Sequence, residues 1–137
     1  MKKVTIEEFM AFKPCYSKEK ILEIAQGKKE WTALEVLALD IPSQDKLWAV
    51  LHEEFIDEPI LHEFACQCAE TALELIDKPD KRSIDAIAAK RAWLRGEIDD
   101  IQLVAAWRVA SSAAYDAATA AKNTAYATQL ELLRTLL

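Results

Sequence analysis

The stretch Asp57-Glu58-Pro59-Ile60-Leu61-His62-Glu63-Phe64-Ala65-Cys66-Gln67-Cys68-Ala69-Glu70-Thr71-Ala72-Leu73-Glu74-Leu75-Ile76 carries the strongest fold signal in the chain. It opens with a capping residue, an acid and a proline in the first turn, which is how helices commonly begin. Apolar residues then recur three and four positions apart, at Leu61, Phe64, Ala65, Cys68, Ala72, Leu75 and Ile76. The stretch therefore predicts one long amphipathic helix that ends at Ile76, before Asp77-Lys78-Pro79-Asp80.

Upstream of this helix, capping signals divide residues 1–56 into short helices. Thr5 with Glu8 and Thr32 with Glu35 have the capping-box spacing, and the second box predicts a helix over Ala33–Leu39. Ser17 is expected to cap a helix that runs from Lys18 to Gln26 and stops at Gly27. Ser43 is expected to cap the helix that carries Leu47, Trp48, Leu51 and Phe55.

Downstream, a helix is predicted over Ser83–Leu94, with Gly96 as its stop signal. From Asp99 the sequence becomes rich in alanine, which favours one long helix with a smooth ridge. The ridge consists of Ala106, Ala110, Ala113, Ala114, Ala117, Ala120 and Ala121. Asn123-Thr124 is a possible break before a leucine-rich end, which must pack on the body of the protein or on a second copy.

The chain has 137 residues, two glycines and four prolines, and no alternating run of β-branched residues. We expect a single all-α domain, a bundle of about six to eight helices, with short helices over 1–56 and the long ones over 57–137. Its 23 acidic and 17 basic residues give a formal charge of −6, which disfavours nucleic-acid binding. The odd number of cysteines and the lack of a targeting or membrane-spanning segment favour a cytoplasmic location. No cofactor is expected, because no glycine-rich phosphate loop is present.

His62-Glu63-Phe64-Ala65-Cys66 is similar to a zinc-hydrolase helix in which the second histidine is replaced by cysteine. Glu70 continues the same face, and His52 on the preceding helix is another possible ligand. This pattern gives one hypothesis, a metal-dependent enzyme centred on His62, Glu63 and Cys66. The favoured interpretation is a border histidine beside a half-buried cysteine, with Cys68 in the core and no metal bound.

Other candidate sites have structural explanations that we favour. The four tryptophans (Trp31, Trp48, Trp93 and Trp107) are at helical spacing from aliphatic residues, which favours core packing over base stacking. The basic residues Lys78, Lys81, Arg82, Lys90, Arg91 and Arg95 are expected to form a solvated face. Arg91 and Arg108 each continue an apolar stripe of a helix. We expect the guanidinium group of each to extend to water. The alternative is a half-buried ion pair with an acid, which would fix the register of the helices.

Two further segments matter for function and for the fold. Glu53, Glu54, Asp57 and Glu58 lie within six residues, and an acidic cluster of this kind suits a basic protein partner. Asp57 and Glu58 also serve the helix dipole, which is the favoured explanation for those two residues. At the Asp80–Ser83 connection, we expect Asp80 or Arg82 to tie the turn to the next helix by capping or by charge-assisted hydrogen bonds.

Residues from about 57 to 125 resemble the immunity proteins of bacterial polymorphic-toxin systems and similar small phage or prophage proteins. The resemblance lies in residues 61–70, in Pro79-Asp80-Lys81-Arg82-Ser83-Ile84-Asp85-Ala86-Ile87, and in Ala92-Trp93-Leu94-Arg95-Gly96-Glu97-Ile98 with the alanine-rich continuation. It implies a non-enzymatic protein that works by binding another protein. Asp80, Arg82, Arg91 and Gly96 match the pattern, and the resemblance implies a structural role for them.

Three functional hypotheses follow. The first is a protein-binding module of phage or mobile-element type, either an immunity protein or an inhibitor of a host system. The second is the metal-dependent enzyme described above. The third is a structural or oligomerising phage protein that self-associates through the alanine ridge or the leucine-rich end.

Overall fold

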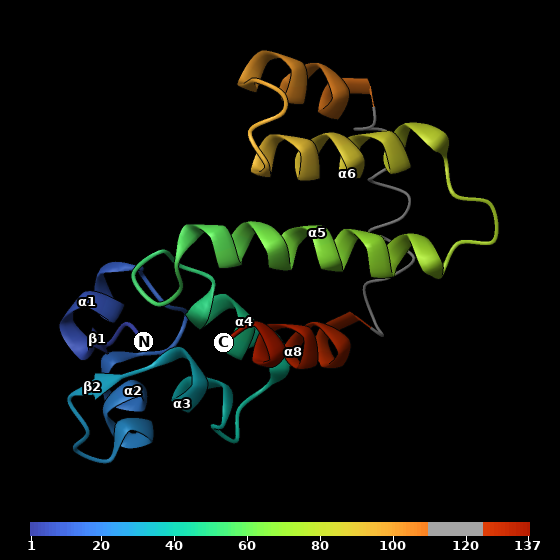
Figure 1. The fold of residues 1–137 in the computed structure, drawn as a ribbon. Coiled ribbons are helices and arrows are strands. Elements are labelled where there is room, and N and C mark those ends of the chain that lie inside the picture. The colour runs from blue at the N-terminus through green and yellow to red at the C-terminus, as the bar shows by residue number, and fades with distance from the viewer. Residues whose placement is uncertain (110–124) are drawn as a thin grey trace. The chain divides into compact units, whose positions relative to one another are not determined.

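The computed structural model describes residues 1–109 and 125–137 of the chain. Helices dominate it, so the predicted all-α class is confirmed (Figure 1). The elements, in chain order, are β1 (Val4–Thr5), α1 (Ile6–Ala11), α2 (Lys18–Ala25), β2 (Glu30–Trp31), α3 (Ala33–Leu37), α4 (Ser43–Val50), α5 (Glu58–Glu74), α6 (Lys81–Leu94) and α8 (Ala125–Leu136). Residues 100–109 are also helical. The predicted alanine ridge from Ala110 to Ala121 and the break at Asn123-Thr124 lie outside the described residues.

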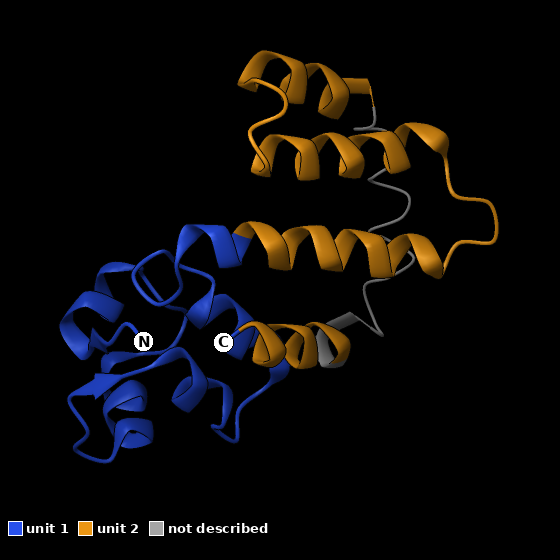
Figure 2. Cartoon of the chain, viewed as in Figure 1, with its two compact units in different colours: residues 1–61, 137 blue, residues 62–136 orange. Residues whose placement is uncertain are grey.

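The chain forms two compact units (Figure 2). Unit 1 comprises Met1–Leu61 together with Leu137, and unit 2 comprises His62–Leu136. The boundary falls within α5, close to the expected division between residues 56 and 57.

The short helices of unit 1 begin where their capping residues predict. The Thr5 hydroxyl accepts the backbone N–H of Glu8 at 3.2 Å, and the Glu8 carboxylate accepts the backbone N–H of Thr5 at 2.8 Å. Thr32 and Glu35 repeat this reciprocal pair at the start of α3. The Ser17 hydroxyl accepts the N–H of Lys20 at the start of α2. Each box satisfies two backbone groups that the first helical turn leaves without a partner.

Three local expectations in unit 1 are wrong. Ser43 lies inside the first turn of α4, with Pro42 at the capping position and no side-chain capping bond. Helix α3 ends at Leu37, earlier than the predicted Leu39. A two-stranded antiparallel sheet, which was not predicted, pairs Val4 with Trp31 and Thr5 with Glu30. Strands of two residues each are too short to produce a detectable alternation in the sequence.

The core of unit 1 gathers side chains from β1, from α2, α3 and α4, and from the turn after α4. Helices α3 and α4 pack against each other. The buried apolar residues are Val4, Ile21, Ala25, Ala33, Val36, Leu37, Leu47, Ala49, Val50, Phe55 and Ile56. Phe55 and Ile56 lie in the loop between α4 and α5, and their burial anchors this loop.

In unit 2, α5 and α6 lie side by side (Figure 1). Helix α5 ends at Glu74, before the predicted Ile76. Cys66 is buried and Cys68 only partly so, which reverses the expected roles of the two cysteines. The reason is the position of α6: Cys66 lies between Glu63 and Glu70 on the face of α5 that Arg91 of α6 covers.

Helix α6 ends at Leu94, as predicted, and Gly96 follows its C-cap in a Schellman motif. Gly96 has a φ of +73°, and the N–H groups of Gly96 and Glu97 donate to the carbonyls of Trp93 and Ala92 at 2.9 Å each. The leucine-rich end forms α8, in which Leu130 and Leu133 are buried. These two leucines therefore pack within the chain.

Candidate binding site

The acidic segment, defined as residues 53–58, lies in unit 1 between α4 and α5 and includes Glu58, the first residue of α5. Glu53, Glu54, Asp57 and Glu58 are all exposed. Phe55 and Ile56 between them are 3% and 1% exposed. The two buried side chains anchor the segment, so that the acids on either side face solvent. The structure thus exposes all four predicted acids: Glu53, Glu54 and Asp57 lie on the loop, and Glu58 lies in the first turn of α5.

Lys2, which precedes β1, binds this segment. Its ammonium group lies 2.8 Å from Asp57 Oδ1 and donates to the Glu53 carbonyl oxygen at 2.7 Å. The hydrogen bond and the positive charge of Lys2 lower the pKa of Asp57. Lys2 therefore offsets one of the four negative charges and holds the backbone of the segment in place.

Aromatic rings border the acidic segment. The His52 ring stacks on Phe12 with centroids 4.2 Å apart and 14° between planes, and it also meets the edge of Trp48. Trp48 in turn contacts Phe9, and it is 41% exposed. The prediction that the tryptophans lie in the core is wrong for Trp48 and for Trp107, which is 64% exposed. Aromatic side chains are enriched at protein-binding surfaces.

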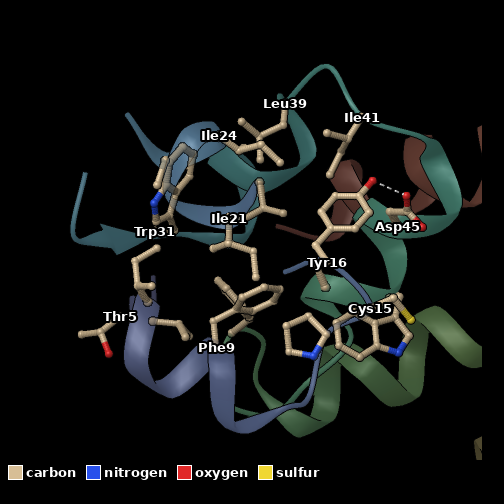
Figure 3. A pocket seen from close by; sticks show the side chains of 18 of the residues that line it. Thr5, Phe9, Cys15, Tyr16, Ile21, Ile24, Trp31, Leu39, Ile41 and Asp45 are labelled. Carbon is tan, nitrogen blue, oxygen red and sulfur yellow. Dashed lines mark hydrogen bonds between the residues drawn. The ribbon is translucent and has the colours of Figure 1, made fainter. Parts of the chain in front are cut away.

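A pocket of about 190 Å³ opens within unit 1 (Figure 3). Its walls are mostly aliphatic and aromatic, with Phe9, Ile21, Ile24 and Trp31 among them. The Tyr16 hydroxyl donates to Asp45 Oδ2 at 2.6 Å, as the dashed line in the figure marks. This hydrogen bond to a carboxylate raises the pKa of Tyr16. The pocket could not be predicted from a local sequence pattern. Its walls come from both strands and from α1, α2, α3 and α4, which are brought together only by the fold.

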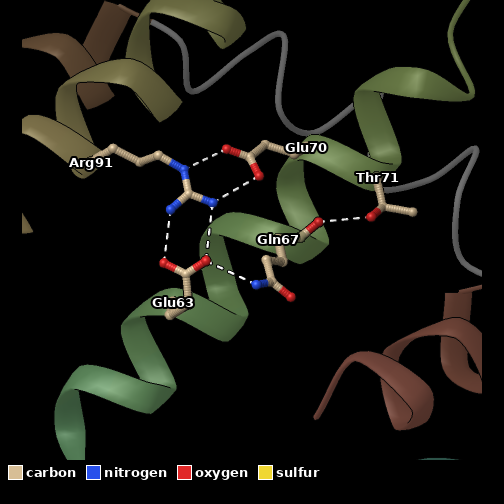
Figure 4. Close-up of polar contacts among 5 residues, drawn as sticks. All are labelled: Glu63, Gln67, Glu70, Thr71 and Arg91. Carbon is tan, nitrogen blue, oxygen red and sulfur yellow. Dashed lines mark hydrogen bonds and ion pairs between the residues drawn. The ribbon is translucent and has the colours of Figure 1, made fainter. Parts of the chain in front are cut away.

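The predicted snorkelling of Arg91 is wrong, and the half-buried ion pair that was the alternative is present (Figure 4). Arg91 Nε and Nη2 donate to the two Glu70 carboxylate oxygens at 2.6 and 2.8 Å. Its Nη1 and Nη2 donate to Glu63 at 2.7 and 3.2 Å. One guanidinium on α6 thus holds two carboxylates of α5 in bidentate geometry. Hydrogen bonds from Arg91 lower the pKa of both Glu63 and Glu70 and raise that of Arg91.

These contacts weaken the zinc-enzyme hypothesis. Glu63, the residue at the general-base position, is bonded to Arg91 and also to Gln67 at 2.9 Å. The His62 ring lies edge-on to Trp93 at 5.2 Å. Burial raises the pKa of the Cys66 thiol and raises that of Cys68 to about 11, so both are protonated at neutral pH. Within residues 1–109 and 125–137, no three His, Cys, Asp or Glu side chains are grouped so as to hold a metal ion.

In the connection before α6, Asp80 and Arg82 make the predicted capping and charge-assisted hydrogen bonds. Asp80 caps α6 by accepting the N–H of Arg82 at 2.8 Å, and its carboxylate also binds the Arg82 guanidinium at 2.9 and 2.6 Å. Both hydrogen bonds to Arg82 lower the pKa of Asp80 to about 2. The side chain of Arg82 thus binds Asp80, the residue that caps the N-terminus of its own helix.

The predicted basic face is largely paired with acids or an aromatic ring. Lys81 binds Asp85, Arg95 binds Glu97, and Lys90 lies over the Trp93 ring at 3.9 Å. With Arg82 and Arg91 also bound to acids, this face offers little net positive charge to a nucleic-acid backbone.

None of the helices that the structure describes is both long enough and apolar enough to cross a membrane. Comparison of the sequence with protein-family models gives no match, and comparisons with curated proteins and with solved structures give no significant match either.

Proposed function

We propose that this chain is a non-enzymatic protein-binding module that captures a basic partner through the acidic segment. The exposure of Glu53 and Glu54 on a loop fixed by Phe55 and Ile56 is the observation that carries the proposal. A fixed loop presents its charges without first having to be ordered, which lowers the entropic cost of binding. Opposite charge on the partner would speed the encounter of the two proteins.

The wider class follows from the resemblance of residues 57–125 to immunity proteins. A cytoplasmic protein of phage or mobile-element origin would then neutralise a toxin or inhibit a host system by covering a basic surface. The overall charge of −6 suits such a partner. The pairing of Glu63 with Arg91 supports a binding function over the metal-enzyme alternative, because it leaves the predicted base engaged in the packing of two helices.

An affinity capture with matched baits tests the proposal. Wild-type protein, Glu53→Lys/Glu54→Lys and Glu19→Lys/Glu23→Lys would each be immobilised and exposed to host lysate, and bound proteins identified by mass spectrometry. The second pair reverses the same number of exposed charges on α2 of the same unit. We expect a basic protein that wild type and the α2 variant retain and the Glu53/Glu54 variant loses. Equal retention by all three baits would rule out the acidic segment as the interface.

A second candidate function, self-association, is favoured by one observation. The helical residues 100–109 expose large apolar side chains, with Ile101 80% and Trp107 64% exposed. Soluble monomers rarely expose contiguous apolar surface of this kind. Because Leu130 and Leu133 are buried, residues 100–109 are the better candidate contact than the leucine-rich end. Sedimentation equilibrium over a range of concentrations should then show dimers that Trp107→Lys abolishes, whereas a constant monomer mass would remove this candidate.

A further inference from the structure

We propose that the pocket of unit 1 is a binding site for a small organic cation, an aromatic or branched apolar group that carries a protonated nitrogen. This site does not include the exposed acids of the acidic segment, although Phe55 of that segment lines it, and its test uses no protein partner. The proposal rests on the size of the pocket, the character of its walls and the chemistry of the Tyr16–Asp45 pair.

The size of the pocket sets the size of the ligand. Its volume is about 190 Å³. An apolar cavity of about 150 Å³ in another protein is large enough to bind benzene. The pocket therefore accommodates one or two fused rings with a short substituent, and it is too small for a folded peptide segment.

The walls favour an apolar body. Ile21 and Ile24 of α2, Phe9 of α1 and Trp31 of β2 surround the space, as Figure 3 shows. Trp31 adds a ring face for stacking, but its Nε1 atom is buried, has no hydrogen-bond partner and is closed to solvent. A ligand thus meets the tryptophan as an apolar surface, and burial of its own rings is the main favourable contribution to binding.

The polar pair fixes the sign of the ligand's charge. Tyr16 and Asp45 both line the pocket, and Tyr16 donates its single hydroxyl proton to Asp45 Oδ2, so the pair can only accept further hydrogen bonds. A ligand must therefore bring the donor, and a protonated nitrogen brings a charge opposite to that of Asp45 as well. A ligand carboxylate would face Asp45 with like charge and would be excluded.

Three probes of similar shape test this inference in the full-length protein. Tryptamine carries an ammonium group, indole is neutral and indole-3-acetate is an anion. Each would be titrated into ¹⁵N-labelled protein while the four tryptophan indole N–H resonances are followed by NMR. We expect saturable shifts for Trp31 and Trp48, which line the pocket, and none for Trp93 and Trp107, which do not.

The expected order of affinity is tryptamine, then indole, then indole-3-acetate, with about fivefold between the first two, as for a partly exposed ion pair. Asp45→Asn should bring tryptamine to the affinity of indole, whereas the control Glu19→Gln, which removes one charge outside the pocket, should leave the order unchanged. The comparison of the three probes uses only the wild-type protein, so it tests the charge preference of the pocket even if Asp45→Asn does not fold. Absence of saturable shifts with all three probes, or binding of indole-3-acetate as tight as that of tryptamine, would overturn the proposal.

Discussion

At the scale of single residues, Arg91 determines how α5 and α6 meet. One guanidinium satisfies Glu63 and Glu70, which are seven positions apart on α5, and so fixes both the register and the separation of the two helices. Its side chain is 30% exposed, and those of its two acidic partners are 33% and 39% exposed. Water screens part of this interaction, so its contribution is well below that of a fully buried ion pair.

Arg91→Met should lower the free energy of unfolding by about 1–2 kcal/mol at neutral pH, because it leaves two half-buried carboxylates facing each other without a cation. Urea denaturation monitored by circular dichroism measures the loss. Arg95→Met is a suitable control, because Arg95 pairs with Glu97 beyond the end of the same helix and both side chains are more than half exposed. Equal losses for the two variants would contradict a special role for Arg91.

The same cluster predicts a pH dependence. The folded pKa values of Glu63 and Glu70 lie below the ordinary value of 4.5. Their stabilisation is therefore complete above about pH 4.5 and is lost as the pH falls through the folded values. The difference in stability between wild type and Arg91→Met should therefore shrink as the pH falls below about 4.5. A difference that stays constant over this range would show that the carboxylates are not coupled to Arg91.

Asp80 and Arg82 are predicted to differ in importance, although they bind each other. Asp80 accepts both the backbone N–H and the side chain of Arg82, so Asp80→Ala removes the cap of α6 as well as the ion pair. Arg82→Ala leaves the cap intact and removes only an exposed pair. Thermal melts should therefore show a clearly larger drop for Asp80→Ala, with Asp80→Asn in between. A larger drop for Arg82→Ala would mean that the ion pair matters more than the cap.

At the scale of elements, Gly96 ends α6 through its backbone conformation alone. With φ at +73°, it occupies the left-handed region, and a Cβ added there would meet no atom within 4 Å. Gly96→Ala should therefore cost about 1–2 kcal/mol from backbone strain without any steric clash. Gly96→Asn should cost less, because asparagine tolerates this region better. Equal stability of all three proteins by urea denaturation would show that the Schellman turn contributes nothing.

The elements also show what local sequence determines. The boxes at Thr5–Glu8 and Thr32–Glu35 were predictable because both partners lie within one turn and need nothing from elsewhere in the chain. The Ser43 prediction failed because the helix begins one residue too early for it: Ser43 is already helical, and Pro42 occupies the capping position without a side-chain capping bond.

Features that depend on distant segments were not predictable in the same way. Cys66 is buried in place of Cys68 because of where α6 lies against α5. The spacing of apolar residues along α5 does not indicate the position of α6. Arg91 could be recognised as unusual on its stripe, but the choice between snorkelling and pairing depended on two acids more than 20 positions away. The pocket needs four helices and two strands to meet, which is why it was missed.

At the scale of the whole molecule, the two units carry different features. Unit 1 holds the acidic segment, the exposed aromatic rings and the pocket, all formed by residues 1–61. Unit 2 holds the Arg91 cluster and the capped ends of α6. The proposed relation to immunity proteins rests mostly on residues of unit 2, whereas the proposed binding surface lies in unit 1. Partner recognition is therefore expected to follow substitutions in unit 1, and stability to follow those of the Arg91 cluster.

The kinetics of partner binding test the proposed function most directly. With the captured protein immobilised, surface plasmon resonance would compare wild type, Glu53→Lys/Glu54→Lys and Glu19→Lys/Glu23→Lys at several salt concentrations. We expect the wild-type association rate to fall as salt rises, and Glu53→Lys/Glu54→Lys to associate more slowly than the α2 variant, with an unchanged fold. If the Glu53/Glu54 variant binds with the kinetics of wild type at every salt concentration, the acidic segment is not the interface and the proposed function is wrong.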